Sequence, residues 1–157
     1  MKAFVLCLLV LILASSAAAA APTAAPKGCR SDLRTGVLPA WARGGFSDPR
    51  PRMPHVVGRG GHIVAILFGY PLLSPPAKRR NNKILWVARS AWQGQSDLRI
   101  RAQRVQSGRP IGRRVARTVT GGPGPSIVDL PAPGCWRLTL RWGGRSDRLD
   151  LEYRPNR

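Results

Sequence analysis

Two groups of lysine and arginine residues are the side chains of this sequence best suited to chemistry, and that chemistry is anion binding. The groups are Lys78, Arg79, Arg80 and Lys83, and then Arg99, Arg101, Arg113, Arg114 and Arg117. Guanidinium and ammonium groups bind phosphate, sulfate and carboxylate groups, and few acidic residues stand near either group. We therefore expect an anion-binding face. A solvated loop and a solvated strand face explain the same residues equally well.

The whole chain is strongly basic. It has 26 lysine and arginine residues against 7 acidic residues, a formal net charge of +19, and its lysines stand only at positions 2, 27, 78 and 83. Such a charge attracts polyanions, whether nucleic acids, anionic lipid headgroups or acidic cell-wall polymers. Arginine enrichment from a GC-rich genome is the alternative explanation, and both stay open.

The cysteines predict one disulfide bond and no metal site. Cys7 lies in an amino-terminal apolar run, which is interpreted below as a cleaved secretory signal peptide. Its removal leaves Cys29 and Cys135 as a pair. An even pair in an exported protein predicts a disulfide, here closing a loop of about 100 residues and contributing at most about 4–5 kcal/mol. Two cysteines with the distant His55 and His62 lack the spacing of metal ligands.

Catalytic motifs are sparse in the sequence. It contains no Gly-x-Ser-x-Gly elbow, P-loop or dinucleotide fingerprint, so we expect no cofactor. A pair of carboxylates could hydrolyse a glycosidic bond, and Asp129 or Asp147 is the residue we would assign to such a hydrolase. Asp150 and Glu152 are expected to point outward from a strand, as partners of neighbouring arginines.

The amino terminus has the pattern of a secretory signal peptide. Lys2 precedes an apolar run at Phe4–Ala14, and small residues follow through Ala21. The run is too short to span a bilayer comfortably, so an uncleaved anchor is the second interpretation. We expect a signal peptide at 1–20, a flexible leader and disulfide-tethered arm at 21–52, and a β-sandwich domain at 53–154.

The stretch Gly134–Tyr153 must position much of the domain. Its apolar residues alternate in two runs, which are Trp136, Leu138, Leu140 and Trp142, then Leu149, Leu151 and Tyr153. Strict alternation predicts two half-buried strands, and the glycines between the runs predict a hairpin. We expect Trp142 to lie opposite either Asp147 or Leu149, and both registers produce a cross-strand ion pair.

Further strands are expected upstream of this hairpin. They are Pro54–Gly58, His62–Gly69, Lys83–Arg89, Leu98–Ala102, Arg114–Thr120 and Ser126–Leu130. The continuous apolar run of His62–Gly69 is typical of a strand buried on both faces. Leu72–Asn82 is expected to be a loop, and one helical turn is expected around Trp41. About seven or eight short strands with no helical period predict an antiparallel all-β sandwich.

The segment Leu130–Leu138, in which a Pro/Gly turn precedes Trp136, resembles the late strand pair of bacterial immunoglobulin-like and fibronectin III-like domains. Trp86 resembles the core tryptophan of an early strand in these domains. The overall layout also resembles uncharacterised secreted proteins of high-GC bacteria, and this resemblance implies no activity. Because Cys29 precedes every predicted strand, its disulfide is expected to join the arm to a sheet.

Together these patterns predict a secreted, non-enzymatic β-sandwich with a binding or structural role at the cell envelope. The expected partner is an anionic polymer or lipid headgroups. Nucleic acid is disfavoured, because export removes the usual target and only Trp92 is expected to be an exposed aromatic for base stacking. Two alternatives remain, the hydrolase already named and an accessory domain that binds a protein through an apolar patch around Trp41 or Trp92.

Overall fold

The computed structural model describes Cys29 and residues 33–90 and 96–156. The predicted signal peptide, the leader up to residue 28, and Trp92 lie outside these residues. In the described chain the only helix is the 3-10 helix η1 (Ala40–Ala42), which confirms the helical turn expected around Trp41. No helix among the described residues has the length and apolar character that a membrane crossing requires.

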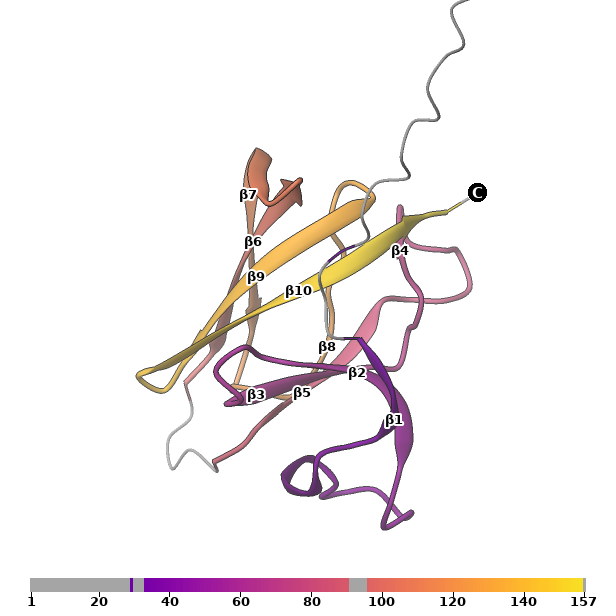
Figure 1. The fold of residues 1–157 in the computed structure, drawn as a ribbon, viewed down its shortest axis with the longest axis vertical. Coiled ribbons are helices and arrows are strands. Elements are labelled where there is room, and N and C mark those ends of the chain that lie inside the picture. The colour runs from indigo at the N-terminus through magenta and orange to yellow at the C-terminus, as the bar shows by residue number, and fades with distance from the viewer. Residues whose placement is uncertain (1–28, 30–32, 91–95, 157) are drawn as a thin grey trace, which may run out of the picture.

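The described strands form two five-stranded sheets. In order across the first sheet, they are β1 (Arg34–Val37), β2 (Arg52–Val57), β3 (Ile63–Leu67), β5 (Lys83–Ala88) and β8 (Pro125–Ile127). In order across the second, they are β4 (Leu72–Ser74), β10 (Arg145–Pro155), β9 (Gly134–Trp142), β6 (Leu98–Gln106) and β7 (Arg109–Val119). In Figure 1, β9 and β10 run together above β2, β3 and β5.

The main hydrophobic core lies between the two sheets. The three central strands of the second sheet, β6, β9 and β10, contribute alternate side chains to this core. Ile100, Leu138 and Leu151 therefore lie in the core, while their neighbours along each strand face outward. The tryptophans Trp86, Trp136 and Trp142 are at most 2 % exposed, which confirms that they serve this core. Burying an apolar side chain of this kind contributes roughly 1.5–3 kcal/mol, so the alternating pattern dominates the folding of the sandwich.

Strand β3 is buried on both faces, as its unbroken apolar sequence predicts. Ile63, Ala65 and Leu67 belong to the main core, whereas Val64 and Ile66 belong to a second cluster on the other face of the first sheet. The second cluster also contains Leu38 and Ala42 from the segment around η1, which therefore covers that face. The predicted range 21–52 thus holds a paired strand, β1, as well as η1.

The β9–β10 hairpin forms with a register different from both expected ones. Trp142 lies opposite Arg145, so the turn consists of Gly143 and Gly144 alone. Both glycines have positive φ angles, and such a pair closes the two-residue turn that matches the twist of the strands. The longer turns that we expected were wrong, but the shift is an even number of residues, and every apolar side chain keeps its face.

The structure has ten strands in place of the expected seven or eight, because β1 and β4 were not predicted. Leu72–Ser74, expected to be part of a loop, forms β4 and pairs in parallel with Tyr153–Pro155. Because its partner is parallel and distant in sequence, β4 has no hairpin pattern that would predict it. The prolines that flank it, Pro71 and Pro75, favour a loop instead. β7 also begins earlier than expected, at Arg109, because Ser107 and Gly108 make the turn. Pro110 is tolerated since β7 is an edge strand.

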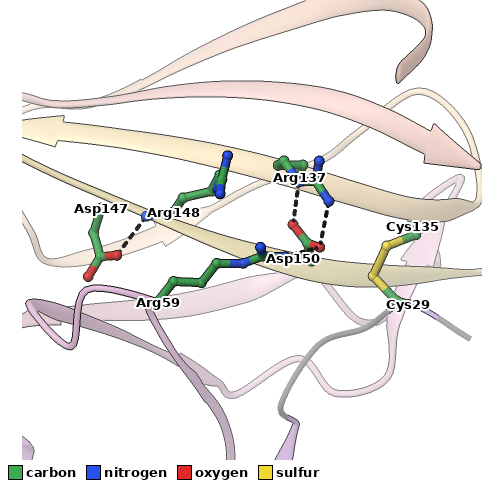
Figure 2. Close-up of polar contacts among 7 residues, drawn as sticks. All are labelled: Cys29, Arg59, Cys135, Arg137, Asp147, Arg148 and Asp150. Atoms are coloured by element: carbon green, nitrogen blue, oxygen red, sulfur yellow. Dashed lines mark hydrogen bonds and ion pairs between the residues drawn. A yellow bond between two sulfur atoms is a disulfide. The ribbon is translucent and has the colours of Figure 1, made fainter. Parts of the chain in front are cut away.

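The predicted disulfide is present and joins Cys29 to Cys135. Its two Cα atoms are 4.9 Å apart, and the bond links positions separated by 106 residues. Cys29 precedes β1 and Cys135 lies in β9 (Figure 2), so the bond connects the amino-terminal segment to the second sheet, as expected. The amino-terminal segment is thereby attached to both sheets, by this bond and by the pairing of β1 with β2.

Removal of the disulfide should lower stability without changing the fold. We expect the double variant C29S/C135S to lose about 2–4 kcal/mol of unfolding free energy, because the unfolded chain is no longer cross-linked. Urea unfolding measures this difference. A thiol reductant should lower the stability of the parent protein to that of the variant and leave the variant unchanged. Equal stability of the two proteins without reductant would contradict the prediction.

Candidate anion-binding face

The outward face of the second sheet carries a cluster of arginines. The alternation that buries Ile100, Leu138 and Leu149 turns their neighbours away from the core. Four of these outward residues, which we call the arginine face, are Arg99 and Arg101 on β6, Arg141 on β9 and Arg148 on β10. All four are exposed, and rigid strands rather than loops hold their backbones in place.

The pairing of the strands sets the geometry of the arginine face. Arg99 lies directly opposite Arg141. In the adjoining row, Thr139 lies opposite Arg101 on one side and Arg148 on the other. Neighbouring strands are about 4.8 Å apart, and like charges placed directly opposite one another destabilise a sheet. The four side chains therefore surround Thr139 with positive charge that the fold itself does not require.

The nearest acidic residue on this face is already engaged by other arginines. The side chain of Asp150 is only 2 % exposed, and it accepts hydrogen bonds from Arg59 at 3.0 Å and from Arg137 at 3.1 Å. Figure 2 shows Asp150 between these two guanidinium groups. The prediction that Asp150 pairs with an arginine is confirmed, but the carboxylate is buried under its partners rather than exposed at the surface.

Among the described residues, no carboxylate forms an ion pair with the arginine face. The ion pairs of the described chain join Asp150 to Arg59 and Arg137, and the exposed Glu152 to Arg154, 3.6 Å apart. An exposed pair of this kind contributes about 0–1 kcal/mol. The positive charge of the arginine face therefore remains available to an external anion.

Asp147 fixes the β2–β3 loop against the beginning of β10. Its carboxylate accepts hydrogen bonds from the backbone amides of Gly60, His62 and Arg148, at 2.8, 2.9 and 2.7 Å respectively. The backbone amide of Arg59 donates to the carbonyl of Arg148, so the loop covers an edge of β10 that β4 does not reach. Asp147 and Asp150 together place Arg59 beside the arginine face.

Glycine is required where this loop meets Asp147. A Cβ atom at Gly58 would overlap the Asp147 carboxylate, and one at Gly60 would approach its Oδ1 to 3.2 Å. The contact between the loop and the carboxylate therefore depends on the absence of a side chain at Gly58. Neither Gly58 nor Gly60 has a positive φ angle, so the close approach of Asp147, rather than the backbone conformation, is the reason for glycine at position 58.

A shallow hollow lies where the β2–β3 loop meets the arginine face. Its volume is about 350 Å³, and it is lined by Arg59, Gly60, Thr139, Arg141, Ser146, Asp147 and Arg148. A second hollow, of about 380 Å³, lies beside Trp142, whose indole nitrogen is buried without a hydrogen-bond partner in the described part of the chain. Its wall includes Ser90, the last described residue before the gap at 91–95.

The first predicted cationic group lies at the opposite side of the second sheet from β7. Lys78, Arg79 and Arg80 follow β4, which is one edge strand, whereas β7 is the other. The guanidinium group of Arg80 donates to the carbonyls of Tyr70 and Pro71. Lys83 lies at the start of β5, its ammonium group 5.5 Å from the centre of the Phe68 ring. The two predicted groups therefore do not form one face.

The second predicted group is divided by the fold. Arg99 and Arg101 belong to the arginine face, while Arg113 and Arg114 are exposed on β7, near the point where its pairing with β6 shifts register. Arg117 lies opposite Ile100, on the core-facing side of this edge strand, and its guanidinium group donates to the carbonyl of Asp129 at 2.9 Å. Arg117 therefore has a structural contact of its own.

Three arginines at this site are absent from the two groups predicted from the sequence. Arg141 and Arg148 come from the β9–β10 hairpin, and Arg59 comes from the β2–β3 loop. The alternation within the hairpin is a signal for Arg141, since it is the neighbour of two buried residues. Arg59 has no local signal, because its partner Asp150 is 91 positions away.

The two carboxylates considered for hydrolysis are not neighbours. Asp147 begins the inward-facing run of β10, whereas Asp129 follows β8 and accepts a hydrogen bond from the buried Asn82. Tyr153, whose hydroxyl donates to the carbonyl of Val128, lies about 20 Å further along β10 than Asp147. Burial, and to a lesser degree the charge of Asp129, raise the pKa of Tyr153 well above its usual value.

No three histidine, cysteine, aspartate or glutamate side chains gather in the described part of the chain where they could hold a metal ion. His55 is buried and forms a hydrogen bond with the carbonyl of Met53 through Nδ1, whereas His62 is exposed immediately before β3. Comparison with known proteins found no matching family model, and no significant match to a curated protein or a solved structure.

The buried contact of Asp150 should matter more than the exposed one of Glu152. We expect D150N to lose about 1.5–3 kcal/mol of unfolding free energy, because it weakens charge-assisted hydrogen bonds to both Arg59 and Arg137. The matched variant E152Q removes an exposed carboxylate from the same strand and should lose at most about 1 kcal/mol. Urea unfolding compares the two, and equal losses would show that burial of Asp150 is unimportant.

Substitution of Gly58 should loosen the β2–β3 loop. We expect G58A to lose about 1–3 kcal/mol, because the added methyl group displaces the Asp147 carboxylate from its backbone donors. G36A is the control, since a Cβ atom at Gly36 meets nothing within 4 Å. In thermal unfolding, G58A should have a lower midpoint temperature than the parent protein, and G36A should not. An unchanged midpoint for G58A would mean that the loop adapts to the methyl group without loss of stability.

Proposed function

We propose that this protein is a secreted, non-enzymatic β-sandwich whose arginine face binds an anionic polymer of the cell envelope. The observation that carries the proposal is the placement of Arg99 opposite Arg141, with Arg101 and Arg148 in the adjoining row and no carboxylate partner among the described residues. Repulsion within this group is relieved when an anion binds, so a polyanion gains both from direct contacts and from the relief of strain in the free protein.

An extended polymer suits the arginine face better than a lipid surface does. Proteins that lie on membranes combine basic residues with apolar side chains that enter the lipid. The large apolar side chains exposed in the described chain are Phe68, which follows β3, and Ile127 on β8. Ile127 belongs to the first sheet and Phe68 follows a strand of that sheet, so the arginine face offers charge without an apolar anchor. A row of anionic groups along a polymer matches positive charges repeated on neighbouring strands.

Two observations favour binding over the hydrolase alternative. The two carboxylate oxygens of Asp147 together accept three backbone hydrogen bonds, and Asp129 is bonded to Asn82 and lies in another part of the fold. A pair of carboxylates flanking one bond would have to be about 5–10 Å apart. The protein-partner alternative depends on Trp41 or Trp92, and Trp41 packs against the cluster around η1.

We also infer export and an immunoglobulin-like arrangement of the sandwich. Export is supported by the signal-like sequence of the first 20 residues and by the Cys29–Cys135 bond, since disulfides persist mainly outside the cytoplasm. The immunoglobulin-like arrangement is supported by the facing sheets, by the core tryptophan Trp86, and by the turn before β9. The bond from the amino-terminal segment to β9 is a departure from the antibody pattern.

Removal of two arginines from the face should weaken polyanion binding. We expect R99Q/R141Q to elute from a heparin column at lower salt than the parent protein. With a soluble polyanion, the plot of log affinity against log salt should become shallower by about one to two. The control R34Q/R52Q removes the same charge from the first sheet and should elute near the parent protein.

Heparin retention and vesicle binding separate the other possible binding surfaces and ligands. The triple variant K78A/R79A/R80A tests the loop after β4, and a loss as large as that of R99Q/R141Q would make the loop part of the binding surface. Equal elution of R99Q/R141Q and R34Q/R52Q would mean that net charge alone matters and would refute the proposed face. Binding to vesicles of anionic lipid, but not to soluble polyanions, would replace the polymer with a membrane surface.

A further inference from the structure

We propose that the hollow beside Arg141 and Arg148 is a subsite for a single tetrahedral oxyanion, a phosphate or sulfate group carried by the polymer. The inference rests on the proposed function, because it names the group by which the arginine face would recognise its ligand. Binding in the hollow differs from general electrostatic attraction, because the hollow combines positive charge with hydroxyl groups and a fixed wall.

Hydrogen-bond donors from three elements converge on the hollow. Arg141 and Thr139 come from β9, Ser146 and Arg148 from β10, and Arg59 from the β2–β3 loop. Ser146 lies directly opposite Arg141, and Arg148 lies directly opposite Thr139. Each of these two arginines is thus directly opposite a hydroxyl-bearing residue of the neighbouring strand. Within the described chain, the side chains of these four strand residues have no hydrogen-bond partner, so their donors are available to a ligand.

The wall of the hollow is held in place before any ligand arrives. Asp147 and Asp150 fix the β2–β3 loop and the Arg59 side chain through the contacts described above. Asp147 is among the residues that line the hollow, and three backbone amides donate to its carboxylate and offset its charge. A preorganised group of donors binds an anion with little loss of conformational entropy.

The arrangement favours a tetrahedral anion over a planar carboxylate. A carboxylate presents two oxygens in one plane, whereas donors here approach from two strands and from a loop at the edge of β10. A phosphate or sulfate ester presents three outer oxygens in different directions and can accept from several of these groups at once. The volume of about 350 Å³ is roughly ten times the share of one water molecule, about 30 Å³, and leaves room for the adjoining part of a polymer.

Inorganic phosphate is the probe that tests the subsite. In a titration followed by backbone amide NMR signals, we expect saturable shifts at Gly60, Thr139 and Ser146. Sulfate should produce the same shifts, whereas acetate at equal ionic strength should bind more weakly. T139V and S146A should each weaken phosphate binding by about 3-fold to 10-fold, the effect of losing one hydrogen bond. T118V is the matched control, because Thr118 is exposed beside Arg99 and does not line the hollow.

The outcomes separate the subsite from the arginine face. If phosphate causes no saturable shift at the hollow while heparin retention still depends on Arg99 and Arg141, the subsite is wrong and the proposed function stands. Equal effects of T139V and T118V, or equal binding of acetate and phosphate, also refute the subsite. If heparin retention does not depend on Arg99 and Arg141, but phosphate binds the hollow, the subsite stands without the polymer.

Discussion

The position of Asp147 and Asp150 on β10 determines how the rest of the second sheet is used. Asp147 faces inward and accepts hydrogen bonds from three backbone amides, whereas Asp150 faces outward and lies under Arg59 and Arg137. Both carboxylates connect β10 to a loop of the first sheet, so the contact between the layers is polar at this edge and apolar in the centre. A buried carboxylate is tolerated only where donors surround it, and both sites meet this condition.

This arrangement has a second effect, on the surface charge. The described chain contains few acidic residues, and the three in β10 all have other partners. Asp147 binds backbone amides, Asp150 binds Arg59 and Arg137, and Glu152 pairs with Arg154. The arginines that bind Asp150, namely Arg59 and Arg137, are separate from the four of the arginine face, which form no ion pair with any described residue. The positive charge of the arginine face therefore depends on the fold, which gives the nearby carboxylates other partners, as well as on the composition of the chain.

Much of the fold could be predicted from the sequence, because alternation is a local property. The run Trp136–Trp142 and the apolar segment Ile63–Leu67 are strands as predicted, and the disulfide follows from a single pair of cysteines. The all-β sandwich is confirmed at this level. The predicted hairpin register was wrong because a two-residue turn and a longer one satisfy the same alternation. β4 escaped prediction because its partner is distant in sequence and the pairing is parallel.

The candidate site was harder to predict than the fold, because it depends on which strands are neighbours. Arg99 and Arg101 are identifiable from their outward alternation, but their proximity to Arg141 and Arg148 follows only from the strand order β10-β9-β6. The same order separates the residues after β4 from those on β7. Density of charge along the sequence is thus a poor guide to density of charge in space, which the register of the sheet determines.

The eleven residues of β7 form an outer strand whose free edge pairs with no other described strand, and such an edge offers a template for another strand. β7 carries Arg109, Arg113, Arg114 and Arg117. A second copy of the protein that approached β7 edge to edge would therefore bring the same positive charges against them. The mutual repulsion opposes growth of the sheet from one molecule into the next. Basic residues on β7 that need not contact any ligand can therefore still serve the protein, by keeping it from self-association.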